Sequence, residues 1–235
     1  MQIQRRYRFN NILNCRDIGG YPTPDGVTKF GRFIRCGIVS TPEDWEIEEL
    51  MKLHISTSID LRGTYEATET PLKLDRIKNA DIYNLPLFEF NVATKEGMDL
   101  PLARIYENIV DNNKKSIARV LNTIADAKDG LIMYNCFFGK DRTGILTMLL
   151  LSIAGVSKED IIADYQQTYT YIKPYIQTHA DVLWDKNSEK HYSLPETMEE
   201  LIEIIENKHG TVLEYIRTAG VSEEAIEKIR NRLCE

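Results

Sequence analysis

The sequence predicts an α/β fold, in which a sheet is flanked by helices and the C-terminal part is helical. Short apolar runs alternate with helical patterns up to about residue 156, and only helical patterns follow. With 43% apolar residues in 235 positions, the chain is long enough to fill one core. We therefore expect a single domain over residues 1–235, with residues 157–235 as a helical extension of it.

The elements expected in the first half are turns, strands and one helix. Residues 1–30 are rich in Gly, Pro, Asn and Asp, which predicts turns and short strands. The apolar segment 33–36 predicts a strand, and a Thr-Pro-Glu-Asp start predicts a helix over 41–53. Alternating apolar side chains predict a strand over 55–61, and we expect a further strand over 82–87.

The second half is expected to carry one short strand among helices. The apolar run 131–134 lies between the turn Asp129-Gly130 and a glycine-containing loop, which predicts a buried strand. Residues 143–154 are nearly all apolar, which is typical of a central buried helix. The other helical patterns cover residues 102–110, 116–127, 157–171, 196–208, 211–219 and 222–233.

Composition narrows the classes of function. The formal net charge of -7 disfavours a general nucleic-acid binder, although it permits a small basic pocket. The N-terminus lacks an apolar signal core and no apolar run is long enough to span a bilayer, so we expect a cytoplasmic protein without stable membrane insertion. The four cysteines form no CxxC motif and the four histidines lack metal spacing, so we expect reduced thiols, no metal and no cofactor. Nothing in the sequence indicates an oligomeric state.

The most informative segment is a Cys-x5-Arg loop, Cys136-Phe137-Phe138-Gly139-Lys140-Asp141-Arg142, between the buried strand and the central helix. A loop of this length can turn its backbone N–H groups inward as an anion cradle, and the following helix points its positive end at the same place. Arg142 offers a planar fork for two phosphate oxygens, and Gly139 gives the backbone the freedom that a tight curve needs.

These donors together favour the thiolate form of Cys136 at neutral pH. A thiolate at the base of a phosphate cradle can attack phosphorus and form a phosphocysteine, which water then hydrolyses. The hydroxyl of Thr143, the next residue after the arginine, can donate a hydrogen bond to the departing sulfur. The pattern therefore predicts a cysteine-dependent phosphatase.

Residues Asn135–Gly144 resemble the His-Cys-x-x-Gly-Lys-Asp-Arg-Thr-Gly loop of the bacterial tyrosine-protein phosphatase family, of the LipA/PtpB-like type, which includes dual-specificity and phosphoinositide-active members. Five further segments are similar to motifs of that family: Asn14–Gly20, Gly31–Cys36, the Asp60-Leu61-Arg62 segment followed by Glu66, and the C-terminal stretches at Asp164-Tyr165 and His209–Val212. The resemblance implies a cysteine-phosphatase-like central mixed sheet. It also implies phosphorylated substrates: phosphotyrosine, with phosphoserine, phosphothreonine, phosphoinositides or inositol phosphates as further possibilities.

The chain departs from the family pattern at two places. Asn135 stands where the family has His before the nucleophile, and Asn can donate and accept hydrogen bonds but carries no charge. This departure leaves open an alternative function, a pseudophosphatase that binds phosphorylated ligands with weak or no turnover. Phe137 and Phe138 are bulky for the two variable positions and can narrow the pocket or form an apolar collar. Sulfur-transfer and arsenate-reducing enzymes also use Cys-x5-Arg, but they do not need the Lys-Asp-Arg-Thr-Gly continuation.

The general acid is not fixed by the sequence, because the chain has no Trp-Pro-Asp segment. Asp141, inside the loop, is the first candidate by resemblance, and Asp60, at the end of a predicted strand, is the second. Both are also candidates for purely structural partners of Arg142 or Arg62.

Several other residues are candidates for the site, and for some of them a structural role or simple solvent exposure is the alternative to a functional role. Lys140 can contact a second phosphate or an acidic head group, or it can be a solvated loop lysine. Arg16 and Asp17 are expected to form a buried ion pair that supports the loop from behind. Cys15 and Cys36 are more readily explained as small core residues than as redox partners of Cys136.

Overall fold

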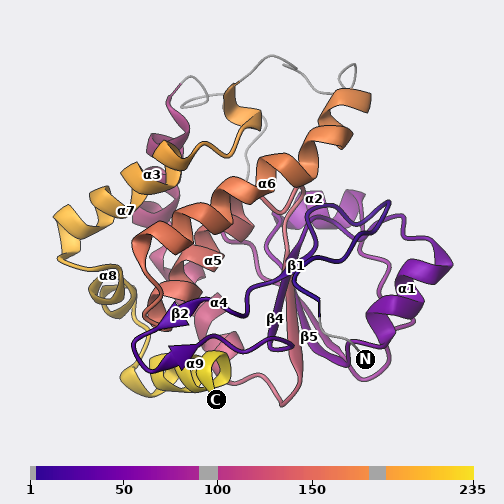
Figure 1. The fold of residues 1–235 in the computed structure, drawn as a ribbon, viewed down its shortest axis with the longest axis horizontal. Coiled ribbons are helices and arrows are strands. Elements are labelled where there is room, and N and C mark those ends of the chain that lie inside the picture. Colours follow the sequence, from indigo (N-terminus) through magenta and orange to yellow (C-terminus); the bar gives the residue numbers. More distant parts are fainter. Residues whose placement is uncertain (1–3, 90–99, 180–188) are drawn as a thin grey trace.

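A five-stranded mixed sheet forms the centre of the computed structural model, which describes residues 4–89, 100–179 and 189–235 (Figure 1). The strand order is β1-β4-β7-β5-β6, and β1 is antiparallel to β4 whereas the other neighbours are parallel. The predicted α/β fold with a central mixed sheet is therefore confirmed. The strands are β1 (Arg16–Asp17), β2 (Pro22–Thr23), β3 (Gly26–Val27), β4 (Phe33–Cys36), β5 (Ile55–Asp60), β6 (Asp81–Asn84) and β7 (Leu131–Asn135).

Strands β2 and β3 form a separate two-stranded hairpin. The α-helices of the described residues are α1 (Asp44–Met51), α2 (Thr64–Glu69), α3 (Leu102–Asn112), α4 (Lys114–Ala125), α5 (Asp141–Ile153), α6 (Lys158–Thr178), α7 (Pro195–His209), α8 (Val212–Thr218) and α9 (Glu223–Cys234). A single 3-10 turn, Glu189–His191, precedes α7.

The two faces of the sheet carry different cores, because successive side chains of a strand point to opposite faces. On β7, Ile132 and Tyr134 belong to the larger core, whereas Leu131 and Met133 belong to the smaller one. The larger core is built with α3 to α9, and the smaller one with α1 and the N-terminal segment. Figure 1 shows this division, with α1 on one side of the strands and α5, α6 and α7 on the other.

Helix α5 is the central buried helix that the sequence predicts. Nearly all of its side chains are buried, and α6, α8 and α9 pack against it. It begins at Asp141, two residues before the expected start, because the N–H of Gly144 already donates to the carbonyl of Lys140 at 2.8 Å. Its first turn therefore lies directly at the end of the Cys-x5-Arg loop.

Three elements differ from the sequence expectation by more than a shift of two or three residues at a helix end. Strand β6 ends at Asn84, before Pro86, so it is shorter than predicted. Helix α6 runs seven residues beyond the expected end at Tyr171, to Thr178, with Pro174 inside it. Helix α2 was not predicted, because its six residues include no buried side chain and so give no apolar period. None of the helices in the described ranges is long and apolar enough to cross a membrane.

Candidate active site

The Cys-x5-Arg loop lies where β7 ends and α5 begins, at the edge of the sheet where the parallel strands β4, β5 and β7 all end. Cys136 directly follows β7 and is 1% exposed. Above it lies a cavity of about 320 Å³. The loop contributes Cys136, Phe137, Phe138, Lys140, Asp141 and Arg142 to the cavity wall, α2 contributes Glu66, and α3 contributes several side chains, among them Tyr106.

The carbonyl groups of residues 137–140 all accept hydrogen bonds from the protein around the loop. The first accepts from the N–H of Ile38 at 2.9 Å. The next two accept from Nδ2 of Asn14 at 3.3 and 2.7 Å, and the third carbonyl also accepts from Nη2 of Arg35 at 2.8 Å. The last carbonyl accepts from the N–H of Gly144 at 2.8 Å. The protein therefore fixes which way each peptide group of the loop faces.

The N–H groups of residues 137–140 have no protein acceptor within residues 4–89, 100–179 and 189–235. With the carbonyls held by the surrounding protein, these donors are available to an anion in the cavity. Gly139 makes this geometry possible: its φ is 66°, and a Cβ there would lie 2.5 Å from the carbonyl oxygen of Cys36. Any other residue would push the loop away from β4.

A buried ion-pair network supports the loop from behind. Nε of Arg16 lies 3.0 Å from Oδ1 of Asp164, and Nη1 of Arg35 lies 2.5 Å from Oδ2 of the same carboxylate. Burial alone would raise the pKa of Asp164, but the charges of Arg16 and Arg35 outweigh it and hold that pKa below its ordinary value. Since Arg35 and Asn14 bond to the same loop carbonyl, the network fixes the back of the loop.

The expected pairing of Arg16 with Asp17 is wrong. Adjacent residues of a strand point to opposite faces of the sheet, so the two side chains cannot meet. Asp17 instead accepts hydrogen bonds from the N–H groups of Gly19 and Gly31, both at 2.7 Å. Burial outweighs these bonds and raises the pKa of Asp17 to about 6. Asp17 therefore shapes the turns beside β1 rather than the loop.

Arg142 is held by Glu66 of the unpredicted helix α2. The two side chains make a two-pronged ion pair, with Nη2 of Arg142 2.9 Å from Oε1 of Glu66. Burial would raise the pKa of Glu66, but the bond to Arg142 lowers it below its ordinary value. The guanidinium also lies 5.3 Å from the centre of the Phe88 ring. The guanidinium of Arg142, which would bind two phosphate oxygens, is thus already held in place by the carboxylate of Glu66.

Asp60 is not at the cavity. Its carboxylate, 3% exposed, accepts hydrogen bonds from Nε of Arg62 at 3.0 and 3.1 Å and from Nη2 at 2.6 Å. Asn135 donates to Asp60 Oδ1 at 3.3 Å and to the carbonyl of Cys136 at 3.4 Å. Asp60, paired with Arg62, therefore supports the end of β7 through Asn135. This geometry favours a structural role for Asp60 over a role as the general acid.

Two buried polar atoms of the residues that flank the Cys-x5-Arg loop have no hydrogen-bond partner in the part of the chain that the structure describes. They are Oδ1 of Asn135 and Oγ1 of Thr143. Such atoms are uncommon in folded proteins and often mark a functional site. The Thr143 hydroxyl, one residue after Arg142, is thus free to donate to a negatively charged sulfur or phosphate.

Asp141 and Lys140 form a tight pair on the cavity wall. Nζ of Lys140 lies 2.9 Å from Oδ1 of Asp141, and the same nitrogen donates to the carbonyl of Lys190 at 2.5 Å. Lys140 is 3% exposed, so it is not a solvated loop lysine. Burial would raise the pKa of Asp141, but the charge of Lys140 and a hydrogen bond from Tyr106 outweigh it and lower that pKa.

Phe137 and Phe138 form an aromatic wall at the cavity. Their ring centres are 4.9 Å apart in an edge-to-face arrangement, and Phe138 meets Tyr175 of α6 at 6.0 Å. Phe137 remains 39% exposed. Of the two expectations, a narrowed pocket or an apolar collar, this arrangement agrees with the collar, because both rings line the cavity that α3 also lines.

Cys15 and Cys36 lie in the smaller core, on the opposite face of the sheet from Cys136. Both are buried free thiols. Their place in an apolar core agrees with the interpretation as small packing residues.

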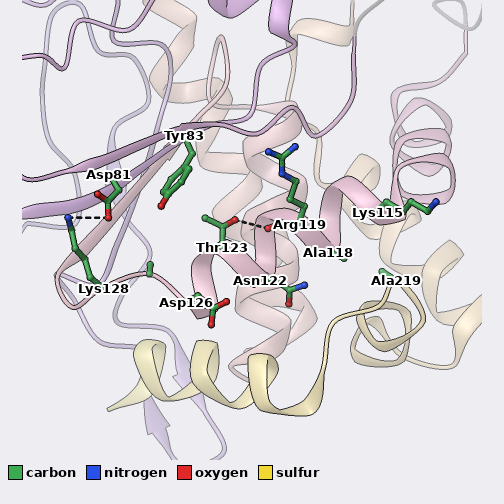
Figure 2. A pocket seen from close by; sticks show the side chains of 11 residues that line it. Asp81, Tyr83, Lys115, Ala118, Arg119, Asn122, Thr123, Asp126, Lys128 and Ala219 are labelled. Carbon is green, nitrogen blue, oxygen red and sulfur yellow. Dashed lines mark hydrogen bonds and ion pairs between the residues drawn. The ribbon is translucent and has the colours of Figure 1, made fainter.

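A second cavity of about 700 Å³ lies between β6 and α4 (Figure 2). Its lining side chains include Asp81, Tyr83, Lys115 and Arg119, and Asp81 forms an ion pair with Lys128 at 3.1 Å. Among the residues that the structure describes, no cysteine, serine or histidine lines it. The loop cavity, by contrast, is lined by Cys136, Asp141 and Arg142.

Comparison with known proteins agrees with this geometry. A family model described as the tyrosine phosphatase family matches residues 7–235. The chain belongs to this family. It is therefore a phosphatase-type hydrolase, as the loop predicts.

Individual relatives are distant. A tyrosine-protein phosphatase of Nostoc commune is 24% identical over 226 residues, which span 86% of this chain and 74% of that protein. The triple specificity protein phosphatase PtpB of Mycobacterium tuberculosis is 27% identical over 137 residues, 51% of this chain and about half (49%) of that protein. A crystal structure of P. aeruginosa TpbA in complex with pTyr covers 91% of this chain and 93% of that one, with 12% identity and a TM-score of 0.41.

Sequence reasoning assigned no site role to several residues that shape the loop. Asn14, Arg35, Asp164 and Glu66 lie in the segments that carry the family resemblance, so their motifs were visible but their contacts were not. Tyr106 lies in a helix that was expected from its apolar period alone, and no sequence signal marks it.

Proposed function

We propose that this phosphatase hydrolyses phosphotyrosine through a phosphocysteine intermediate. The thiolate of Cys136 attacks phosphorus, and the P–O bond to the leaving group breaks while Asp141 gives that oxygen its proton. Water then attacks phosphorus, the S–P bond breaks, and the water proton passes to the Asp141 carboxylate. The Arg142 fork and the loop N–H groups hold the phosphoryl oxygens, and Thr143 donates to the departing sulfur.

The observation that carries this proposal is the orientation of the loop. All four carbonyls of residues 137–140 are bonded to the protein around the loop, and the N–H groups have no protein acceptor in the described ranges. A loop that only linked a strand to a helix would have no reason to leave its donors unpaired. Placed around a cysteine and an arginine, these donors fit a phosphate monoester dianion.

The aromatic wall supports an aryl phosphate as the main substrate. Phe137, Phe138, Phe88 and Tyr106 line the cavity, and their rings can contact the ring of a phosphotyrosine. Phosphoserine, phosphothreonine and phosphoinositides present no such ring. The name of the mycobacterial relative nevertheless makes them worth testing.

The test is phosphate release from a panel of phosphopeptides, inositol phosphates and phosphoinositides, with Cys136→Ser as the blank. We expect phosphotyrosine peptides to be hydrolysed fastest. Tight binding of these peptides without phosphate release would instead establish the pseudophosphatase alternative. Faster hydrolysis of a phosphoinositide would overturn the preference for aryl substrates.

Asn135→His is expected to raise the rate on aryl phosphates and to extend the thiolate form of Cys136 to lower pH. The side chain of Asn135 has a buried, unpartnered Oδ1, whereas an imidazolium has only donors and would add a positive charge beside Cys136. The measurement is the pH dependence of iodoacetate alkylation, together with turnover, in both proteins. Equal alkylation profiles and equal rates would mean that Asn135 already does the work of the family's usual His.

A further inference from the structure

A chain of two buried tyrosines ends on the carboxylate of Asp141. The hydroxyl of Tyr106, on α3, donates to Oδ1 of Asp141 at 2.6 Å. The hydroxyl of Tyr165, on α6, lies 2.9 Å from that of Tyr106. A phenol has a single hydrogen, and Tyr106 gives its own to Asp141, so Tyr165 must be the donor to Tyr106. The direction of the chain is thus from Tyr165 through Tyr106 to the carboxylate.

Both tyrosines are held rigidly. Tyr106 is 0% exposed and Tyr165 is 1% exposed, and their rings meet edge to face with centres 6.3 Å apart. Gly144 of α5 leaves the room for this packing, because a Cβ there would lie 3.1 Å from the Tyr165 ring. Tyr165 also follows Asp164, which fixes the back of the loop. One turn of α6 therefore supports the loop on one side and the tyrosine chain on the other.

The two oxygens of Asp141 have different surroundings. Oδ1 accepts a hydrogen bond from Tyr106 at 2.6 Å and forms an ion pair with Nζ of Lys140 at 2.9 Å. Oδ2 accepts no hydrogen bond from any residue that the structure describes, and the side chain is 34% exposed on the cavity wall. A carboxyl anchored through one oxygen can carry its proton on the other and still keep a fixed orientation.

We propose that Tyr106 is a positioning residue, which with Tyr165 behind it anchors Oδ1 of Asp141 so that Oδ2 carries the proton to the leaving group. The proposal rests on the proposed function, in which Asp141 is the general acid. Tyr106 does not exchange a proton with the substrate. Its donated hydrogen bond also stabilises the ionised carboxylate and so contributes to the lowered pKa of Asp141.

Tyr106→Phe keeps the ring and removes only the hydroxyl. We expect turnover of phenyl phosphate to fall about tenfold, as a fraction of the 10² to 10⁴ that proton transfer typically contributes. Turnover of 2,4-dinitrophenyl phosphate, whose leaving group needs no proton, should stay within about twofold of the wild type. The pH at which phenyl phosphate turnover falls on the alkaline side should move upward, because the carboxyl loses a donor to its ionised form.

Two further variants keep the result interpretable. Tyr215→Phe is the matched control. The buried hydroxyl of Tyr215 donates at 2.7 Å to the carbonyl of Val110, which lies on α3 as Tyr106 does, and it does not contact Asp141. This variant should leave both esters and the pH profile unchanged. Tyr165→Phe removes the donor to Tyr106 without touching Asp141. It should lower phenyl phosphate turnover and raise the pH of the alkaline fall, as Tyr106→Phe does, but by smaller amounts. It serves as the test if Tyr106→Phe unfolds.

The decisive measurement is phenyl phosphate turnover by the double variant that combines Tyr106→Phe with Asp141→Asn. If Tyr106 acts through Asp141, adding Tyr106→Phe to Asp141→Asn should cost no further rate on phenyl phosphate. A further loss in that background, or an equal loss on both esters in the single variant, would overturn the proposal. The proposal also fails if Asp141→Asn itself shows no leaving-group dependence. That outcome is distinct from failure of the phosphatase function, which is decided by phosphate release from the wild-type protein.

Discussion

Cys136→Ser is expected to abolish turnover while leaving the fold and phosphate binding intact. Serine keeps the shape of the side chain, but its hydroxyl is far less acidic than a thiol and is not ionised at neutral pH. Loss of a nucleophile typically lowers kcat by a factor on the order of 10⁴ to 10⁶. Phosphate release from a phosphotyrosine peptide, followed at high enzyme concentration, measures the residual rate.

The binding half of this prediction follows from the loop geometry. The proposed donors to phosphate are the N–H groups of residues 137–140 and the Arg142 guanidinium, and none of them depends on the sulfur. Cys136→Ser should therefore bind phosphate about as tightly as the wild type in a calorimetric titration. Cys36→Ser, which changes a buried thiol on the opposite face of the sheet, is the control and should retain turnover. More than a trace of wild-type rate in Cys136→Ser would mean that the nucleophile is another group.

The fold and the loop could be predicted from the sequence because both depend on local patterns. The strand 131–134, the buried helix after it and the Cys-x5-Arg segment between them are neighbours in the chain, so their order already fixes the loop at a strand end. Helix α2 and the end of α6 were not predictable in this way. The first has no buried face, and the second continues through Pro174, where a sequence pattern predicts a break.

The supports of the site could not be predicted, because they join residues far apart in the chain. Arg16 was paired with its neighbour Asp17, whereas its partner Asp164 lies 148 positions away. Likewise, nothing local relates Tyr106 to Asp141, although the two meet at 2.6 Å. The roles assigned to Cys136, Arg142 and Asp141, and the extent of the single domain, remain predictions that need experiments on the protein.

The second large effect is expected from Asp141→Asn, and it should depend on the leaving group. Phenoxide is a poor leaving group that needs a proton, so phenyl phosphate turnover should fall by about 10² to 10³, within the range of general acid catalysis. An ester of a very acidic phenol needs no proton, and its turnover should stay near the wild-type value. The measurement is kcat for a series of aryl phosphates against the basicity of the phenol.

The pKa of Asp141 determines in which direction phenyl phosphate turnover should change with pH. Lys140 and Tyr106 lower the pKa of Asp141, so in the free enzyme at neutral pH the carboxyl is ionised and unsuited to donate a proton. A bound phosphate dianion and the thiolate are like charges, and they must raise that pKa for Asp141 to act as the acid. Since the acid works only when protonated, wild-type turnover of phenyl phosphate should fall as the pH rises through the pKa of the complex. Asp141→Asn should lack that fall.

Asp60→Asn is the matched control, because Asp60 is the second candidate for the general acid but is bonded to Arg62 away from the cavity. It should lower the rates on all aryl phosphates by a similar factor, since it loosens a support without removing a proton donor. The opposite pattern, with leaving-group dependence in Asp60→Asn and a uniform loss in Asp141→Asn, would reverse the two roles. Asp141 would then be a structural partner of Lys140 and Tyr106, and Asp60 would be the proton donor.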